Sequence, residues 1–165
     1  GGVDAIAGRI IYDISDESAL VSGHAGAAPP HDTGGRSMAD ETYERGLEIR
    51  RHMFGAELTD GQIASATDFN RPFQDVVTRY CFGETWGREE ELPHRIRSMI
   101  TLSMLLALGK PHEIRVHIKG AIANGVTREE IREIILHAAV YCGIPSGVEG
   151  FRAAAEVFTE LGIPT

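Results

Sequence analysis

From Met38 onward, apolar residues recur at three- and four-residue spacing, which is the period of an amphipathic α-helix. No stretch after residue 38 shows a stronger strand or hairpin pattern. The spacing therefore predicts an all-α fold, a helical bundle of about six to seven helices over residues 38–165. We expect these elements at about 38–54, 61–66, 70–83, 93–108, 111–124, 127–143 and 146–161.

Several helix boundaries carry specific signals. Thr127-Arg-Glu-Glu130 fits a capping box, in which the threonine and the glutamate each satisfy a free backbone N–H group. Asn70 is expected to cap the helix that follows it, and Gly83 is expected to end that helix. The helix beginning at Pro93 is apolar around nearly its full circumference, which predicts a buried central helix. A charged loop containing Trp86 is expected just before it.

Residues 1–37 differ in composition from the rest of the chain. Gly23–Ser37 is rich in glycine, proline and alanine and offers little to bury, which is typical of a linker or a disordered tail. One weak strand-like patch spans Gly8–Ile14. We interpret residues 1–37 as a tail, a linker or the remnant of a fusion, and residues 38–165 as the folded domain.

Composition excludes several classes of function. The chain carries 24 acidic and 16 basic residues, a net charge of −8, and so lacks the basic footprint of a nucleic-acid partner. Its longest apolar run, near Met99–Leu108, is too short to span a membrane. With no leader-like sequence at its start, the expected location is the cytoplasm.

Known catalytic motifs are missing from the sequence. It contains no glycine-rich phosphate loop, H-E-x-x-H, G-x-S-x-G or EF-hand pattern. Cys81 and Cys142 are far apart and form no C-x-x-C pair, which argues against a zinc site or a dithiol centre. Dinucleotide-binding, P-loop and zinc-hydrolase functions are therefore unsupported, and no metal site is expected.

The densest group of ionisable residues beside an apolar region lies in the stretch Leu108–Gly125. Glu113 and His117 are four residues apart and share one helix face, and His112 and Arg115 are close to it. His117 is the candidate acid/base, with its charge tuned by Glu113. The alternatives are a buried structural histidine and a plain helix-stabilising pair.

Three arginines are candidates for binding carboxylates. Arg95 and Arg97 begin the predicted core helix, and Arg115 lies on the next helix. A guanidinium group can hold a carboxylate through two parallel hydrogen bonds. The alternative is that all three are ordinary surface or salt-bridging residues.

Six segments, in one order, resemble the carboxymuconolactone decarboxylase family, and the resemblance covers about Met38 to Leu161. The segments are Asn70-Arg-Pro-Phe-Gln-Asp75, Val77-Thr-Arg-Tyr-Cys81, Arg97-Ser-Met-Ile-Thr-Leu102, His112-Glu-Ile-Arg-Val-His117, Asn124-Gly-Val-Thr-Arg-Glu-Glu-Ile-Arg-Glu133 and Ala139-Val-Tyr-Cys-Gly-Ile-Pro145. Family members of the alkylhydroperoxidase type carry C-x-x-C-x-x-x-H. On that pattern the cysteines fall at Lys110 and Glu113 and the histidine at His117, so this chain keeps the histidine without the thiols.

The resemblance implies an alkylhydroperoxidase-like fold in homo-oligomers, trimers or hexamers, with no cofactor. It implies a carbon–carbon lyase that removes CO2 from 4-carboxymuconolactone, a small anionic lactone, to give 3-oxoadipate enol-lactone in aromatic catabolism. His117 and Glu113 would then be catalytic, and Arg95, Arg97, Arg115 and His112 would bind substrate. Two alternatives stay open. One is a thiol peroxidase or disulfide reductase using Cys81 with Cys142, and the other is a non-catalytic oligomeric binder of small anions.

Overall fold

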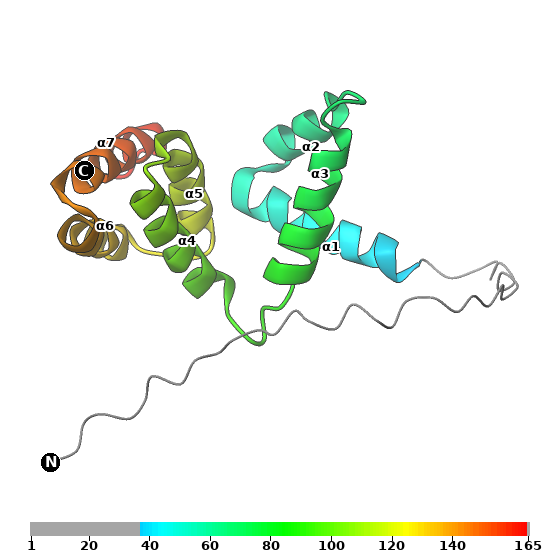
Figure 1. Cartoon of the computed structure of the whole chain (residues 1–165), viewed down its shortest axis with the longest axis horizontal. Helices are drawn as coiled ribbons and strands as arrows, with labels where there is room; N and C mark the ends of the chain where they lie inside the picture. The colour runs from blue at the N-terminus through cyan, green and yellow to red at the C-terminus, as the bar shows by residue number, and fades with distance from the viewer. Residues whose placement is uncertain (1–36, 165) are drawn as a thin grey trace, which may run out of the picture. The chain divides into compact units, whose positions relative to one another are not determined.

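Seven α-helices and one π-helix make up most of residues 37–164, the part of the chain that the computed structural model describes (Figure 1). No strand occurs within these residues, so the all-α prediction is confirmed. The interpretation of residues 1–37 as a tail and the strand-like patch at 8–14 fall outside them, except for Ser37. The elements are α1 (Met38–Phe54), α2 (Ala56–Ala64), α3 (Arg71–Val76), the π-helix η1 (Val77–Trp86), α4 (His94–Leu108), α5 (Pro111–Ala123), α6 (Arg128–Cys142) and α7 (Ile144–Glu160).

Helix α1 lies against η1 at very short distance, and glycines make this possible. A Cβ atom on Gly46 would lie 1.9 Å from the carbonyl oxygen of Thr78, and one on Gly83 would lie 2.2 Å from that of Thr42. The prediction that Gly83 ends a helix is wrong, because η1 continues through it to Trp86. Gly83 allows the two helices to pack closely. Helix α3 continues into η1 without a break (Figure 1).

A second correction concerns Trp86 and the exposed side of this segment. Trp86 is not a loop residue: it ends η1 and is buried with Met53 and Phe82 in a small core. The side of this segment that carries apolar residues at helical spacing is largely exposed, since Phe73 and Tyr80 are each 65% exposed. The buried residues of η1 are the ones that face α1, and they include the polar Thr78.

The main core is built by α4, α5, α6 and α7. Its most deeply buried large side chains are Leu102, Leu106, Ile114, Ile118, Ile131, Ile135 and Val157. The expectation that α4 is buried all round is wrong for a single chain, because Ile100, Met104 and Leu108 are exposed. Its packing partners α5, α6 and α7 leave its other side open to solvent.

Some helix boundaries follow local sequence signals and others do not. The second helix, expected at 61–66, spans Ala56–Ala64. The Thr127 hydroxyl accepts from the Glu130 N–H at 3.2 Å and the Thr127 N–H donates to the Glu130 carboxylate at 2.9 Å, which confirms the capping box. Asn70 does not cap α3, and its side-chain oxygen accepts from the Thr67 N–H instead. Among the described helices, none is long and apolar enough to cross a membrane.

Candidate functional site

His117 lies in the middle of α5 and is half-buried against the end of α1. Its ring meets the ring of Phe54 edge to face, with centroids 5.5 Å apart. The Nδ1 atom is enclosed and has no hydrogen-bond partner in the described structure. A buried polar atom without a partner costs free energy, so His117 Nδ1 is an unsatisfied group in the described structure.

The environment of His117 favours a neutral ring. Burial lowers the pKa of His117 below its ordinary value, and the nearby Glu113 carboxylate offsets part of that effect. Glu113 is itself exposed, one helical turn before the histidine. In the free protein at neutral pH the imidazole is therefore uncharged and able to accept a proton.

A pocket of about 190 Å³, which we call the α5 pocket, opens along α5 next to Phe54, and His117 is not among its lining residues. The pocket is lined by Phe54, Leu58, His112, Arg115, Val116, Lys119 and Glu160. Phe54 connects the two features, since it borders the pocket and also contacts His117. The structure thus brings together His112 and Arg115 of the predicted set.

Two cations of the α5 pocket are paired with carboxylates of α7. Arg115 Nη1 lies 3.0 Å from Glu156 Oε2, and Lys119 pairs with Glu160. These pairs are partly exposed, and such pairs exchange readily with a competing anion because each contributes little free energy. Lys119 and Phe54 were missed from sequence, although Lys119 follows Arg115 by four residues and therefore shares its helix face.

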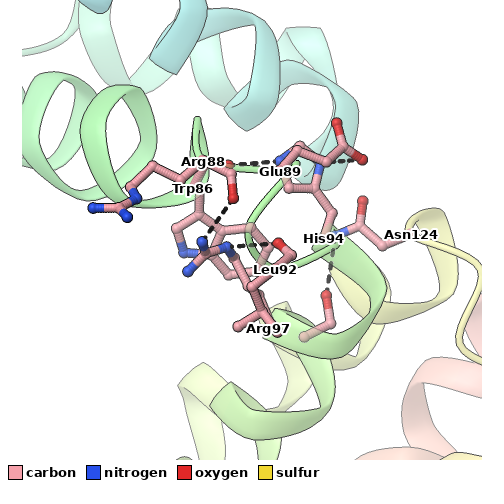
Figure 2. Close-up of polar contacts among 8 residues, drawn as sticks. Trp86, Arg88, Glu89, Leu92, His94, Arg97 and Asn124 are labelled. Carbon is pink, nitrogen blue, oxygen red and sulfur yellow. Dashed lines mark hydrogen bonds and ion pairs between the residues drawn. The ribbon is translucent and has the colours of Figure 1, made fainter.

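Arg97 is engaged in holding the loop between η1 and α4. Its Nε donates to the Leu92 carbonyl at 3.0 Å and its Nη2 donates to the Arg88 carbonyl at 2.9 Å (Figure 2). His94, in the same close-up, lies 2.8 Å from the Trp86 carbonyl oxygen. These contacts give Arg97 a structural role in the chain.

Arg95 is engaged near the opposite end of α5 from His112. Its Nε donates to the Gly125 carbonyl at 3.2 Å, and its guanidinium group pairs with Glu130. Gly125 follows His117 by eight residues, or about 12 Å along a helix axis. The structure therefore does not gather Arg95 and Arg97 with His117.

Arg50 is a buried cation that sequence reasoning passed over. It is 3% exposed and bonds only neutral oxygens: Thr78 Oγ1 at 2.6 Å, Gln62 Oε1 at 2.9 Å and Gln74 Oε1 at 3.1 Å. Burial lowers the pKa of Arg50. Its position three residues after Leu47 and four before Phe54, on the core-facing side of α1, is the signal that could have identified it.

The two cysteines occupy different parts of the bundle. Cys81 is half-buried on η1, which packs on α1 and α3, and burial raises the pKa of this thiol. Cys142 is exposed at the end of α6, which packs on α4 and α7. This placement gives no support to a thiol pair, and no metal-binding group of three or more residues occurs in the described part of the chain.

Comparison with known proteins gives a family match and two relatives of similar sequence. Residues 71–156 match the model of the carboxymuconolactone decarboxylase family. The chain is 39% identical over 124 residues to a 4-carboxymuconolactone decarboxylase of Acinetobacter baylyi, covering 75% of this chain and 92% of that protein. It is 36% identical over 119 residues to the nitrosuccinic acid decarboxylase npaB of Metarhizium robertsii, covering 72% of this chain and 82% of that protein.

Proposed function

Because the chain belongs to the carboxymuconolactone decarboxylase family, we propose that it is a carboxy-lyase that converts 4-carboxymuconolactone to 3-oxoadipate enol-lactone, a step of aromatic catabolism, without a cofactor. The observation that carries this proposal is a half-buried imidazole whose ring contacts Phe54, a residue that also lines a pocket with two partly exposed, ion-paired cations. The similarity to the Acinetobacter baylyi enzyme over nearly its whole length supports the choice of substrate.

The reaction needs an electron acceptor and a proton donor. When the C–CO2 bond breaks, its electron pair moves through the ring double bond toward the lactone carbonyl, and the resulting dienolate takes up a proton on carbon. The substrate has two carboxylates, and a bound anion near His117 raises the pKa of that histidine. His117 then takes a proton from solvent on binding and delivers it to the ring carbon, with Glu113 favouring the charged form.

Substrate binding falls to the cations of the α5 pocket. Arg115 and Lys119 would release Glu156 and Glu160 and take a substrate carboxylate in their place. His112 and the free N–H groups at the start of α5 lie on the same side and favour an anion there. Phe54 contributes an apolar wall, in which a departing carboxylate is poorly solvated.

The exposed apolar residues of the described chain support a homo-oligomer, a trimer or a hexamer, as part of this proposal. Ile100, Met104 and Leu108 of α4 are between 44% and 68% exposed, and Val140 and Tyr141 of α6 are more than 75% exposed. Apolar side chains at this density commonly mark an interface between protein chains. Light scattering on the purified full chain would give the number of copies, and a monomeric mass would contradict this part of the proposal.

A second candidate substrate is nitrosuccinic acid, on the strength of the similarity to npaB. It also carries a group that can accept the electron pair left by CO2. The test is CO2 release by the purified full chain from each compound at matched concentrations. We expect a higher kcat/KM for the lactone. A higher kcat/KM for nitrosuccinic acid would make that compound the preferred substrate. If neither compound released CO2, the proposed decarboxylase activity would be contradicted.

A further inference from the structure

We propose that a cavity between α6 and α7, separate from the α5 pocket, is a binding site for a small aromatic carboxylate. This α6–α7 cavity has a volume of about 160 Å³ and is lined by Ile131, Ile135, Phe151, Ala154 and Phe158, among others, with Arg128 and Arg132 on its α6 side. No residue of this cavity lines the α5 pocket.

The size and shape of the cavity fit one aromatic ring. An enclosed apolar cavity of about 150 Å³ can hold benzene, and this cavity has a similar volume but opens to solvent at Phe151. Phe151 and Phe158 are seven residues apart on α7, so they share one face, and Ala154 and Ala155 lie between them. Two phenylalanines separated by small residues leave a narrow slot, and aromatic rings favour stacked or edge-to-face contact in such a space.

Two arginines border the cavity and have donor groups that can bind an anion. Arg128 and Arg132 are one turn apart on the face of α6 that borders the cavity. Each contacts the glutamate that follows it in sequence through one nitrogen, Arg128 to Glu129 at 3.1 Å and Arg132 to Glu133 at 3.0 Å. The remaining N–H groups of each guanidinium are available to a ligand carboxylate.

The acidic residues of α6 lie on its other face. Glu129 and Glu133 line a different cavity, together with Met99, Ile134 and His137. The carboxylates of Glu129 and Glu133 therefore do not line the α6–α7 cavity, and its apolar part is open to a ligand. A ligand with a flat apolar body and a single negative end matches both parts of this site.

The test uses the purified full chain and benzoate as the probe, with isothermal titration calorimetry as the measurement. A one-ring ligand of this size should bind with a Kd of about 1 mM or lower. Benzyl alcohol has the ring without the charge, and acetate has the charge without the ring. Both should bind at least about tenfold more weakly than benzoate. Equal affinity for all three compounds, or no saturable binding of benzoate, would overturn the proposal.

Variants locate the site. The double variant Arg128→Gln/Arg132→Gln should weaken benzoate at least about tenfold and leave benzyl alcohol unchanged. Ala155→Leu, at an exposed position, should fill the slot and abolish both. Arg152→Gln removes an arginine of α7 that does not line the cavity and should change nothing. If Arg115→Gln abolished benzoate binding and Arg128→Gln/Arg132→Gln did not, benzoate would be bound in the α5 pocket and the proposal would be wrong.

Discussion

The imidazole of His117 and the phenyl ring of Phe54 meet at an interplanar angle of 81°, so the candidate acid/base of α5 is positioned by the last residue of α1. One turn further along α5, a Cβ atom on Gly120 would lie 3.0 Å from the Met53 side chain and 3.2 Å from that of Phe54. A side chain larger than hydrogen at 120 would require the Met53 and Phe54 side chains to shift by a few tenths of an ångström. The environment of His117 thus depends on how closely these two helices pack.

The stability of the protein should fall as the pH is lowered through the range in which histidine titrates. Burial lowers the pKa of His117 in the folded chain, so below the unfolded value of about 6.5 the unfolded state binds the proton more readily. The stability contributed by the neutral, buried His117 is therefore present above about pH 6.5 and is lost as the pH falls toward the pKa of His117 in the folded chain. One such proton gives a slope of at most about 1.4 kcal/mol per pH unit. Urea unfolding at several pH values should show a smaller slope for His117→Gln, and an unchanged slope would contradict the burial of this ring.

Arg97 should matter for stability more than for catalysis. Arg97→Gln removes the charged donors to the Leu92 and Arg88 carbonyls and should lower the free energy of unfolding by about 1.5–3 kcal/mol. Turnover per folded molecule should stay near that of the wild type. If urea unfolding were unchanged while kcat fell, Arg97 would instead belong to the substrate site.

The contact of α1 with η1 should tolerate no side chain at Gly83. Gly83→Ala places a Cβ atom 2.2 Å from a carbonyl oxygen, so a backbone must move, at a cost of about 3 kcal/mol or more. Gly61→Ala, within α2, is the matched control. Its Cβ would have nothing within 4 Å, and it should stabilise the helix by about 0.5–1 kcal/mol. Thermal unfolding of both variants checks this, and similar melting temperatures would contradict the close approach.

The two members of the Arg115–Glu156 pair should have opposite effects on KM. Arg115→Gln removes a donor to the substrate and should raise KM about tenfold. Glu156→Gln removes the carboxylate that competes with substrate for Arg115 and should lower KM or leave it unchanged. Steady-state kinetics on both variants separates this from a purely structural ion pair, for which both changes would act in the same direction.

Local signals in the sequence were sufficient for the helices whose ends are set by local chemistry. The capping box at Thr127 needs only residues three apart, and the left-handed backbone at Gly125 and Gly143 needs only glycine. The π-helix was missed because its course depends on α1. Gly83 lies in a contact with a residue 41 positions earlier, and spacing within one segment carries no information about that contact.

The candidate site could be predicted from sequence only in part. His112, Glu113, Arg115 and His117 are on one short helix, so their proximity follows from helical spacing. Arg95 and Arg97 could not be placed, because the antiparallel packing of α4 on α5 sets their position beside Gly125 and the 87–93 loop. Phe54 was missed for the same reason, since its contact with His117 joins helices that are distant in sequence.

The most direct measurement is the rate of CO2 release from 4-carboxymuconolactone by the wild type and by His117→Gln. A proton-transfer role predicts measurable turnover in the wild type and a loss of about 10²–10⁴ in kcat in the variant. His52→Gln, at an exposed histidine of α1, should retain wild-type kcat. Near-normal turnover by a folded His117→Gln protein would remove this histidine from the mechanism, and no release by the wild type would contradict the proposed activity itself.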